Sequence, residues 1–434
     1  MTAAKDFDAI VVGAGPAGCA TALVLARAGL AVGVIERGGA PGTKNVSGGI
    51  LYGAVLERLV PDLASTAPVE RHVTRHVTTF LTAEAGCSID YRSTALGTPP
   101  YNAFSVLRST FDPWFAGTAE AAGAFVMPAV RVDGLLREGD GGAVVGVQAG
   151  GDDLRSDVVV AADGANSFLA RSAGLRPRND PRQVALGVKA VVALPRERLE
   201  ERFGLSGDEG SAHAFVGDVT AGLAGGGFLY TNRDTLSVGV VVRVDDLVRS
   251  RAKASDLLQS FLAHPLVHPL VRDGELVEYG AHLVPEGGEA MVGRLCTDGM
   301  VVVGDAAGFA INNGLVVRGM DLAIGSGVCA AEAVVEAAGR GDFSAAALAG
   351  YRRRLEDSFV LKDLHTYARA PDFLGRHRMY GAYPRFLTSL FDGVYRTDGS
   401  PREHLVTTAH RAARDSGLKV TELAADALAA TRAL

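Results

Sequence analysis

Three glycines and one glutamate near the start of the chain have the spacing of a dinucleotide-binding site. Gly13, Gly15 and Gly18 lie in the segment GAGPAG, and Glu36 follows 21 residues after Gly15. Such glycines permit a tight turn, close approach of the backbone to a pyrophosphate, and close packing of a helix on a strand. A carboxylate at the position of Glu36 can bind ribose hydroxyls. The pattern therefore predicts a redox dinucleotide, and Glu36 argues against the 2′-phosphate of NADP.

The residues around this motif predict the strand–helix–strand unit that such a site requires. DAIVV (8–12) is a short apolar run typical of a buried parallel strand. CATALVLARAG (19–29) has a helical pattern that Gly29 closes, and LAVGVIE (30–36) predicts a second strand ending at Glu36. The pyrophosphate would then lie on the exposed N–H groups at the start of the helix.

A second segment addresses whether the dinucleotide is a nicotinamide that comes and goes or a flavin that stays bound. MVVVGDAAGF (300–309) predicts a buried strand that runs into a turn of small residues, with a helix after it. Asp305 at the end of this strand could bind the hydroxyls of a ribityl chain, and the helix N-terminus could favour an anionic reduced flavin. A nicotinamide needs no such second anchor, so the segment favours a flavin. The alternative is that Asp305 only caps a helix.

Five longer stretches extend this pattern and resemble one family of flavin-dependent proteins. They are KNVSGGILYG (44–53), SVLRSTFDPWF (105–115), GGGFLYTNRDTLSVGVVV (225–242), VEYGAHLVPEGG (277–288) and GDAAGFAINNGLVVRGMDLAIGSG (304–327). Together they resemble the Fix-type flavoproteins of the electron transfer flavoprotein–quinone oxidoreductase / geranylgeranyl reductase family. The resemblance runs from about residue 6 to about residue 400.

The resemblance implies tightly bound FAD and gives roles to individual positions. It places Gly13, Gly15 and Gly18 at the pyrophosphate, Glu36 at the adenosine ribose, Ser47 and Gly48 near the flavin, Arg108 along the cofactor, the Val132 main chain at the adenine, and Asp305 at the ribityl chain. It also implies that Arg37, and Gly319 in the segment RGMD, contact the cofactor. Arg108 could instead be a surface arginine at a helix start, and Ser47 a loop hydroxyl. We predict no catalytic acid or base and expect no metal site.

The predicted fold class is α/β. It combines a Rossmann-like FAD-binding domain of the glutathione-reductase type 2, a mixed β-sheet substrate domain interleaved with it, and a helical C-terminal region. We expect the FAD-binding domain at residues 1–60, 100–180 and 290–340, the substrate or quinone-side sheet at 61–99 and 181–289, and the helical region at 341–434. Within the first domain, AGGDD (149–153) predicts the turn of a hairpin.

The resemblance also implies a reaction in which electrons arrive from a protein. In this branch of the family an electron transfer flavoprotein supplies electrons and a quinone accepts them, while the protein places and tunes the flavin. Fix-type chains work with a separate small ferredoxin-like protein, and this chain has no cysteine after Cys329 for an iron–sulfur domain of its own. We therefore expect both protein partners. The alternatives are a stand-alone dehydrogenase, reductase or hydroxylase acting on a small apolar metabolite, and an FAD-binding scaffold.

Composition narrows the compartment and the class of partner. A formal net charge of −6 gives no general attraction to nucleic acid. We find no uninterrupted apolar run of the ~18 residues that a membrane-spanning helix needs, and no leader pattern at the N-terminus. Four separated cysteines without a CxxC pair predict neither a disulfide framework nor a self-contained iron–sulfur cluster. We expect a cytoplasmic protein, with contact to the inner face of the cell membrane left open.

The segment 367–395 has an unusual composition, with seven aromatic residues and four arginines. Basic and aromatic side chains together suit a docking surface for a partner or for a membrane interface. The alternative is a packed helical wall of the substrate cavity.

Overall fold

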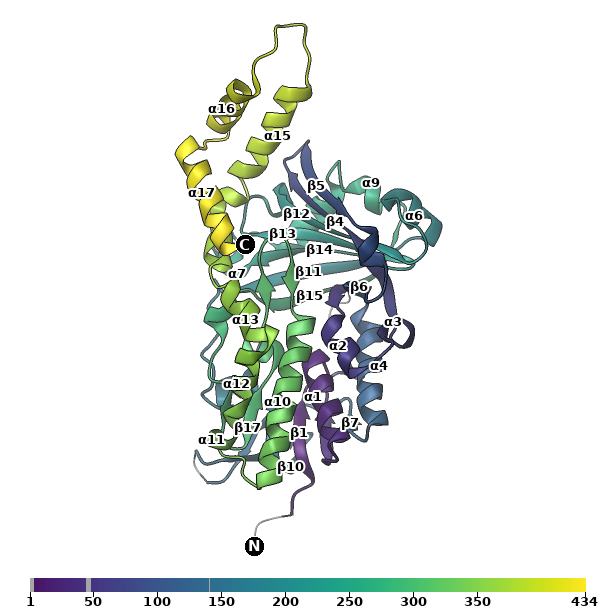
Figure 1. Ribbon diagram of the computed structural model, residues 1–434, viewed down its shortest axis with the longest axis vertical. Helices are drawn as coiled ribbons and strands as arrows, with labels where there is room; N and C mark the ends of the chain where they lie inside the picture. Colours follow the sequence, from purple (N-terminus) through teal and green to yellow (C-terminus); the bar gives the residue numbers. More distant parts are fainter. Residues whose placement is uncertain (1–3, 44–47, 140) are drawn as a thin grey trace.

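A computed structural model describes residues 4–43, 48–139 and 141–434 and places two large sheets along the long axis of the molecule (Figure 1). The first sheet has eight strands, in the order β16–β17–β10–β1–β2–β7, with β8 and β9 joined through β10. Strands β17, β10, β1, β2 and β7 run parallel to one another. The bounds are β1 Phe7–Val12, β2 Val32–Ile35, β7 Phe125–Met127, β8 Val132–Arg137, β9 Val144–Ala149, β10 Asp152–Ala161, β16 Cys296–Thr297 and β17 Met300–Val302.

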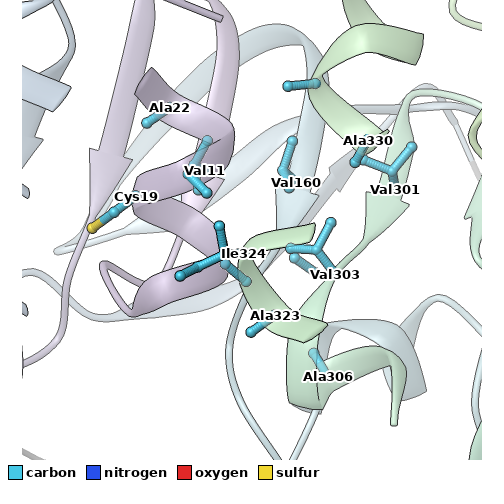
Figure 2. Packing of buried hydrophobic residues seen from close by; sticks show 14 of the residues in the cluster. Val11, Cys19, Ala22, Val160, Val301, Val303, Ala306, Ala323, Ile324 and Ala330 are labelled. Carbon is cyan, nitrogen blue, oxygen red and sulfur yellow. The ribbon is translucent and has the colours of Figure 1, made fainter. Parts of the chain in front are cut away.

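Two helices pack side by side against this sheet and form its core. Helices α1 (Pro16–Arg27) and α10 (Met320–Arg340) share one buried cluster with the strands, and Figure 2 shows Val11, Val160 and Ile324 within it. The helices approach closely because Gly327 faces α1: a Cβ at Gly327 would lie 2.5 Å from the carbonyl oxygen of Ala17. Cover of this kind explains the continuous apolar runs of the parallel strands.

By length and composition, helix α10 could cross a membrane. The sequence had led us to expect no such segment. Within the protein, however, 67% of its apolar window is buried. This burial is the behaviour of a core helix.

The second sheet has nine strands and covers the carboxyl ends of the first (Figure 1). Its order is β15–β11–β14–β13–β12–β4–β6–β3, with β5 paired to β4. The pair β12–β4 is parallel and the other pairs are antiparallel, so the sheet is mixed. The bounds are β3 Gly49–Tyr52, β4 Val69–Leu81, β5 Gly86–Arg92, β6 Ala103–Val106, β11 Val184–Ala193, β12 Glu209–Gly217, β13 Gly225–Thr231, β14 Thr235–Arg243 and β15 Glu275–Pro285.

Strands β9 and β10 of the first sheet lie at the position of the predicted hairpin. The predicted hairpin is confirmed, because Ala149 pairs with Asp152 across Gly150 and Gly151, which both have positive φ. The remaining helices before α10 are α2 Ala54–Leu59, α3 Leu63–Thr66, α4 Arg108–Ala121, α5 Phe168–Ser172, α6 Arg196–Phe203, α7 Val244–Ser250, α8 Ala254–Ala263 and α9 His268–Val271, with a short 3-10 turn, η4, at Gly304–Ala307. A small two-stranded sheet, β18 Ile311–Asn312 and β19 Val317–Arg318, follows η4.

The C-terminal region is helical and runs the length of the molecule. Helices α12 and α13 follow the first sheet, α15 and α16 form an arm that projects beyond the second sheet, and α17 returns beside it (Figure 1). The bounds are α11 Ala345–Leu348, α12 Gly350–Asp357, α13 Phe359–Thr366, α14 Ala370–Leu374, α15 Ala382–Tyr395, α16 Leu405–Asp415 and α17 Val420–Ala433.

Candidate functional site

A cavity of about 1130 Å³ lies between the two sheets. The first sheet contributes the turn after β1, the ends of β2 and β17, and the start of β8 to its lining. The second sheet contributes strands β11, β13 and β15, and the C-terminal helices close the far end. The carboxyl ends of parallel strands are where α/β proteins bind their ligands, so this cavity is the candidate functional site.

The three glycines of GAGPAG lie at the start of α1 and have different physical requirements. Gly13 has φ +106°, and a Cβ there would lie 2.4 Å from the carbonyl oxygen of Ala162. A Cβ at Gly18 would lie 1.9 Å from the carbonyl oxygen of Gly13. At Gly15 a Cβ would meet only Arg108 Nη2, at 3.6 Å. Gly13 and Gly18 are therefore required by the fold, whereas Gly15 leaves open space in the cavity, as a pyrophosphate needs.

Glu36 lies at the end of β2, and the backbone fixes its carboxylate. The N–H of Ala14 donates to Oε2 at 3.0 Å, and the N–H of Gly38 donates to Oε1 at 2.6 Å. Glu36 therefore joins the two turns that frame the cavity. Arg37, which is exposed, and Val132, at the start of β8, line the cavity near it.

Gly48 joins the cavity to the second sheet. Its φ is +92°, and a Cβ there would lie 2.1 Å from Ser237 Oγ on β14, so the backbone passes that strand closely. Ser47, predicted to approach the flavin, lies outside the described residues. Gly319, the N-cap of α10, also lines the cavity, and no atom lies within 4 Å of where its Cβ would be.

Arg108 is the first residue of α4 and faces the cavity. Its Nε and Nη2 donate to the two oxygens of Asp112 at 2.6 and 2.7 Å. Burial opposes the charge of Arg108, but the buried Asp112 carboxylate outweighs this effect and raises the pKa of the guanidinium. Asp112 thus holds a permanent cation beside Gly15.

Asp305 lies in η4, directly after β17, and faces the cavity. Its side chain caps neither η4, whose N-cap is Val303, nor α10. Burial raises the pKa of Asp305, and the nearby Arg108, Arg176 and Lys189 oppose that shift. Arg176, which sequence analysis did not identify, fixes the turn: its Nη1 donates to the carbonyl oxygens of Asp305 at 3.0 Å and of Ala306 at 2.9 Å.

The second sheet gives the cavity a charged and aromatic roof that sequence analysis missed. Lys189, Phe228, Tyr230 and His282 line it. The rings of Phe228 and Tyr230 stack with centroids 5.0 Å apart, and Lys189 Nζ lies 5.7 Å from the Phe228 centroid. Burial lowers the pKa of His282 to about 4, and Lys189 and Arg108 add to the shift. The available signal was the single charge of Lys189 in the apolar run QVALGVKAVVAL.

The far end of the cavity combines apolar and aromatic side chains with a few polar groups, among them Glu286, Asn312 and Arg243. Glu286 Oε1 lies 3.4 Å from Asn312 Nδ2, and burial raises the pKa of Glu286 to about 7. The wall here comes from the segment 367–395 and includes Phe373, Leu374, Met379, Tyr380, Tyr383 and Leu387. The interpretation of this segment as a packed wall is confirmed for these side chains.

One buried carboxylate ties that wall to the last helix. Asp426 on α17 accepts hydrogen bonds from Arg376, from Arg378 at 2.5 and 2.6 Å, and from the hydroxyl of Tyr383 at 2.7 Å. The hydrogen bonds from Arg378 lower the pKa of Asp426 to about 2, despite its burial. Two of the four arginines of the segment are therefore structural.

The cavity fits a dinucleotide cofactor on its own geometry. Gly15 and Gly319 leave open space next to helix starts, and the carboxylates of Glu36 and Asp305 line the same cavity as Arg108. Asp163 Oδ1, on the same lining, is buried without a hydrogen-bond partner among the described residues. Within those residues, no group of three His, Cys, Asp or Glu side chains is arranged to hold a metal ion.

Comparisons with known proteins agree with this geometry. Residues 6–203 match a family model described as an FAD binding domain. The "probable electron transfer flavoprotein-quinone oxidoreductase YdiS" of Escherichia coli K12 is 47% identical over 397 residues, 92% of each chain. Protein FixC of the same organism is 45% identical over 397 residues, and FixC of Azorhizobium caulinodans is 41% identical over 403 residues, again 92% of each chain.

Solved structures show the same fold. A geranylgeranyl bacteriochlorophyll reductase-like protein of Thermoplasma acidophilum has a TM-score of 0.71 at 20% identity, covering 94% of this chain and 96% of that one. A point mutant of the halogenase PltM, in complex with FAD, has a TM-score of 0.63 at 15% identity, covering 95% of this chain and 84% of that one. These likenesses confirm the predicted fold class. The family match identifies the cofactor as FAD.

Proposed function

Because this chain belongs to the family of FixC proteins and electron transfer flavoprotein–quinone oxidoreductases, which are FAD-dependent oxidoreductases, we propose that it takes electrons from an electron transfer flavoprotein and passes them to a quinone. The observation that carries this proposal is similarity over 92% of the chain at 47% identity. That similarity extends well beyond the dinucleotide cradle. FAD, when bound, supplies the ability to exchange one or two electrons.

The residues of the chain would hold FAD and shape the site for an apolar acceptor. Gly15, Glu36, Arg108 and Asp305 would hold it along its length. The apolar wall formed by segment 367–395 would exclude water and receive a flat, uncharged ring such as that of a quinone. No described residue is required as a nucleophile, because electron transfer needs placement and a suitable potential.

Electron transfer from one protein to another requires a docking surface on each of them. We propose that a small ferredoxin-like protein takes part, and that the enzyme works in the cytoplasm at the inner face of the cell membrane. The end of the α15–α16 arm supports the membrane contact, because Phe391, Tyr395, Leu405 and Val406 are exposed there. The test is binding of the protein to anionic lipid vesicles. Loss of binding in the double variant Tyr395→Asp, Val406→Asp would support this placement, and undiminished binding of that variant would refute it.

The decisive experiment tests the electron donor without oxygen. The holoprotein is mixed with excess NADH, then NADPH, then reduced electron transfer flavoprotein, and bleaching of the oxidised flavin is followed. We expect fast bleaching only with the protein donor. Fast bleaching with a nicotinamide would instead support a stand-alone reductase or hydroxylase.

A matched pair of variants tests the acceptor end. Leu387 lines the cavity, whereas Phe391, one turn further along α15, is exposed and lies outside the lining. With a water-soluble quinone, Leu387→Gln should raise the KM for quinone and leave flavin reduction by the donor unchanged. Phe391→Gln should change neither. An unchanged KM in Leu387→Gln would place the acceptor elsewhere.

A further inference from the structure

Lys189 occupies a position in the second sheet at which both neighbours across the ladder are glycines. It lies in the middle of β11, and its partners across the ladder are Gly239 on β14 and Gly280 on β15. Neither partner has a side chain to pack over the lysine stem. Lys189 therefore extends into the cavity, where its Nζ lies 5.7 Å from the Phe228 ring.

The register also determines which charged groups surround this amine. Side chains two residues apart on a strand share a face, so Gly187 and Val191 flank Lys189. Their partners on β15 are His282 and Glu278. Arg108 at the start of α4 and Asp305 in η4 also lie close enough to interact with it electrostatically.

Two cations, Lys189 and Arg108, and two carboxyl groups, those of Asp305 and Glu278, meet here. Burial and Arg108 lower the pKa of Lys189 to about 8, partly offset by Asp305 and Glu278, so the amine stays mainly protonated at neutral pH. His282 stays neutral, because burial together with Lys189, Arg108 and Arg37 lowers its pKa to about 4. Arg108 is already paired with Asp112, whereas no described residue forms an ion pair with Lys189 within 4.0 Å. Lys189 is thus a cation directed at whatever fills the cofactor end of the cavity.

We propose that Lys189 is a cofactor-facing cation that favours the reduced form of the bound flavin over the oxidised form. Reduction places additional electron density on the ring system, and a fixed positive charge in a poorly solvated cavity stabilises it more than water would. Lys189 acts here as a positioning and tuning residue, with no proton transfer assigned to it. The inference depends on FAD binding and not on the identity of the electron donor or acceptor.

The test is the midpoint potential of the holoprotein, measured by slow anaerobic reduction against a reference dye. Lys189→Met should lower the ratio of reduced to oxidised flavin at a fixed potential at least tenfold, which is a fall of ~30 mV in midpoint potential for a two-electron couple. Lys189→Arg keeps the charge and should retain most of the parent value. Lys362→Met removes the same charge from an exposed site on α13 and should leave the potential unchanged.

A second measurement protects the test against loss of the cofactor. If Lys189→Met releases FAD on purification, the apoprotein is titrated with oxidised and with reduced FAD. The proposal predicts a greater loss of affinity for the reduced form. An unchanged potential, or equal losses for both forms, would overturn the role of Lys189. Since no donor protein or quinone enters these measurements, such a result would leave the proposed reaction standing.

Discussion

Replacing Gly15 with alanine should separate loss of FAD from loss of the fold. Gly15 has φ −84° and ψ −177°, which any residue adopts, and a Cβ there would meet only Arg108 Nη2 at 3.6 Å. Alanine is the poorer residue at this N-cap position by roughly 0.5–1 kcal/mol, but it restricts the unfolded chain by a similar ~0.4–1 kcal/mol. The free energy of unfolding of the apoprotein should therefore change by less than about 0.5 kcal/mol.

The added methyl group should act on the cofactor instead. It would occupy space into which the pyrophosphate is predicted to pack, and overpacking costs typically ~1–3 kcal/mol. Since each 1.4 kcal/mol is a factor of ten in Kd, FAD should bind roughly 5- to 150-fold more weakly. The assay is a titration of apoprotein with FAD, followed by flavin fluorescence, beside urea unfolding of the same apoprotein.

Gly18→Ala is the matched control, three residues further along. Its Cβ would lie 1.9 Å from the carbonyl oxygen of Gly13, a contact that the backbone must move to relieve. This variant should lose stability whether or not FAD is present. Parental affinity for FAD in Gly15→Ala would show that the pyrophosphate is not beside Gly15. Unfolding of that variant would show that the space at Gly15 is not free.

Three further predictions concern carboxyl groups that line the cavity or hold its wall in place. Asp305→Asn should weaken FAD binding by about 1.5–3 kcal/mol, since a ribityl hydroxyl loses its charged acceptor; an unchanged Kd in a fluorescence titration would contradict that role. Asp426→Asn should speed amide hydrogen exchange in α17, because two arginines lose their charged acceptor. As the pH falls below 4, exchange in the parent should approach that of the variant, since Asp426 itself becomes protonated with a pKa of about 2. Glu286 has a pKa raised from 4.5 to about 7 in the folded protein, so it binds protons there that the unfolded chain releases. The free energy of unfolding of the apoprotein should therefore fall by about 1–3 kcal/mol as the pH rises between these values. Unfolding curves at pH 5 and pH 8 should show this loss in the parent and not in Glu286→Gln.

The sequence predicted the cradle well because its determinants are local. Gly13, Gly15, Gly18 and Glu36 lie within one strand–helix–strand unit, so spacing along the chain fixes spacing in space. The turn at Asp305 was identifiable for the same reason, as it directly follows a buried strand.

The roof of the cavity was not accessible to that reasoning. Lys189 comes close to Asp305 only because β11 lies between β14 and β15 in one particular register. A shift of one residue would turn the lysine to the other face of the sheet. The apolar run around Lys189 predicts a strand but not its neighbours, and Arg176 likewise depends on a contact across 129 positions of the chain.

Because one cavity is lined from both sheets, the cofactor also has a mechanical consequence. A ligand that contacts Gly15 and Asp305 below and Lys189 above holds the two halves of the molecule together, so its binding free energy adds to the stability of the native state. Melting temperature and resistance to proteases should therefore rise with the concentration of free FAD. In a cell short of riboflavin, the chain would be degraded faster as well as being inactive, so flavin supply would set how much of the protein exists.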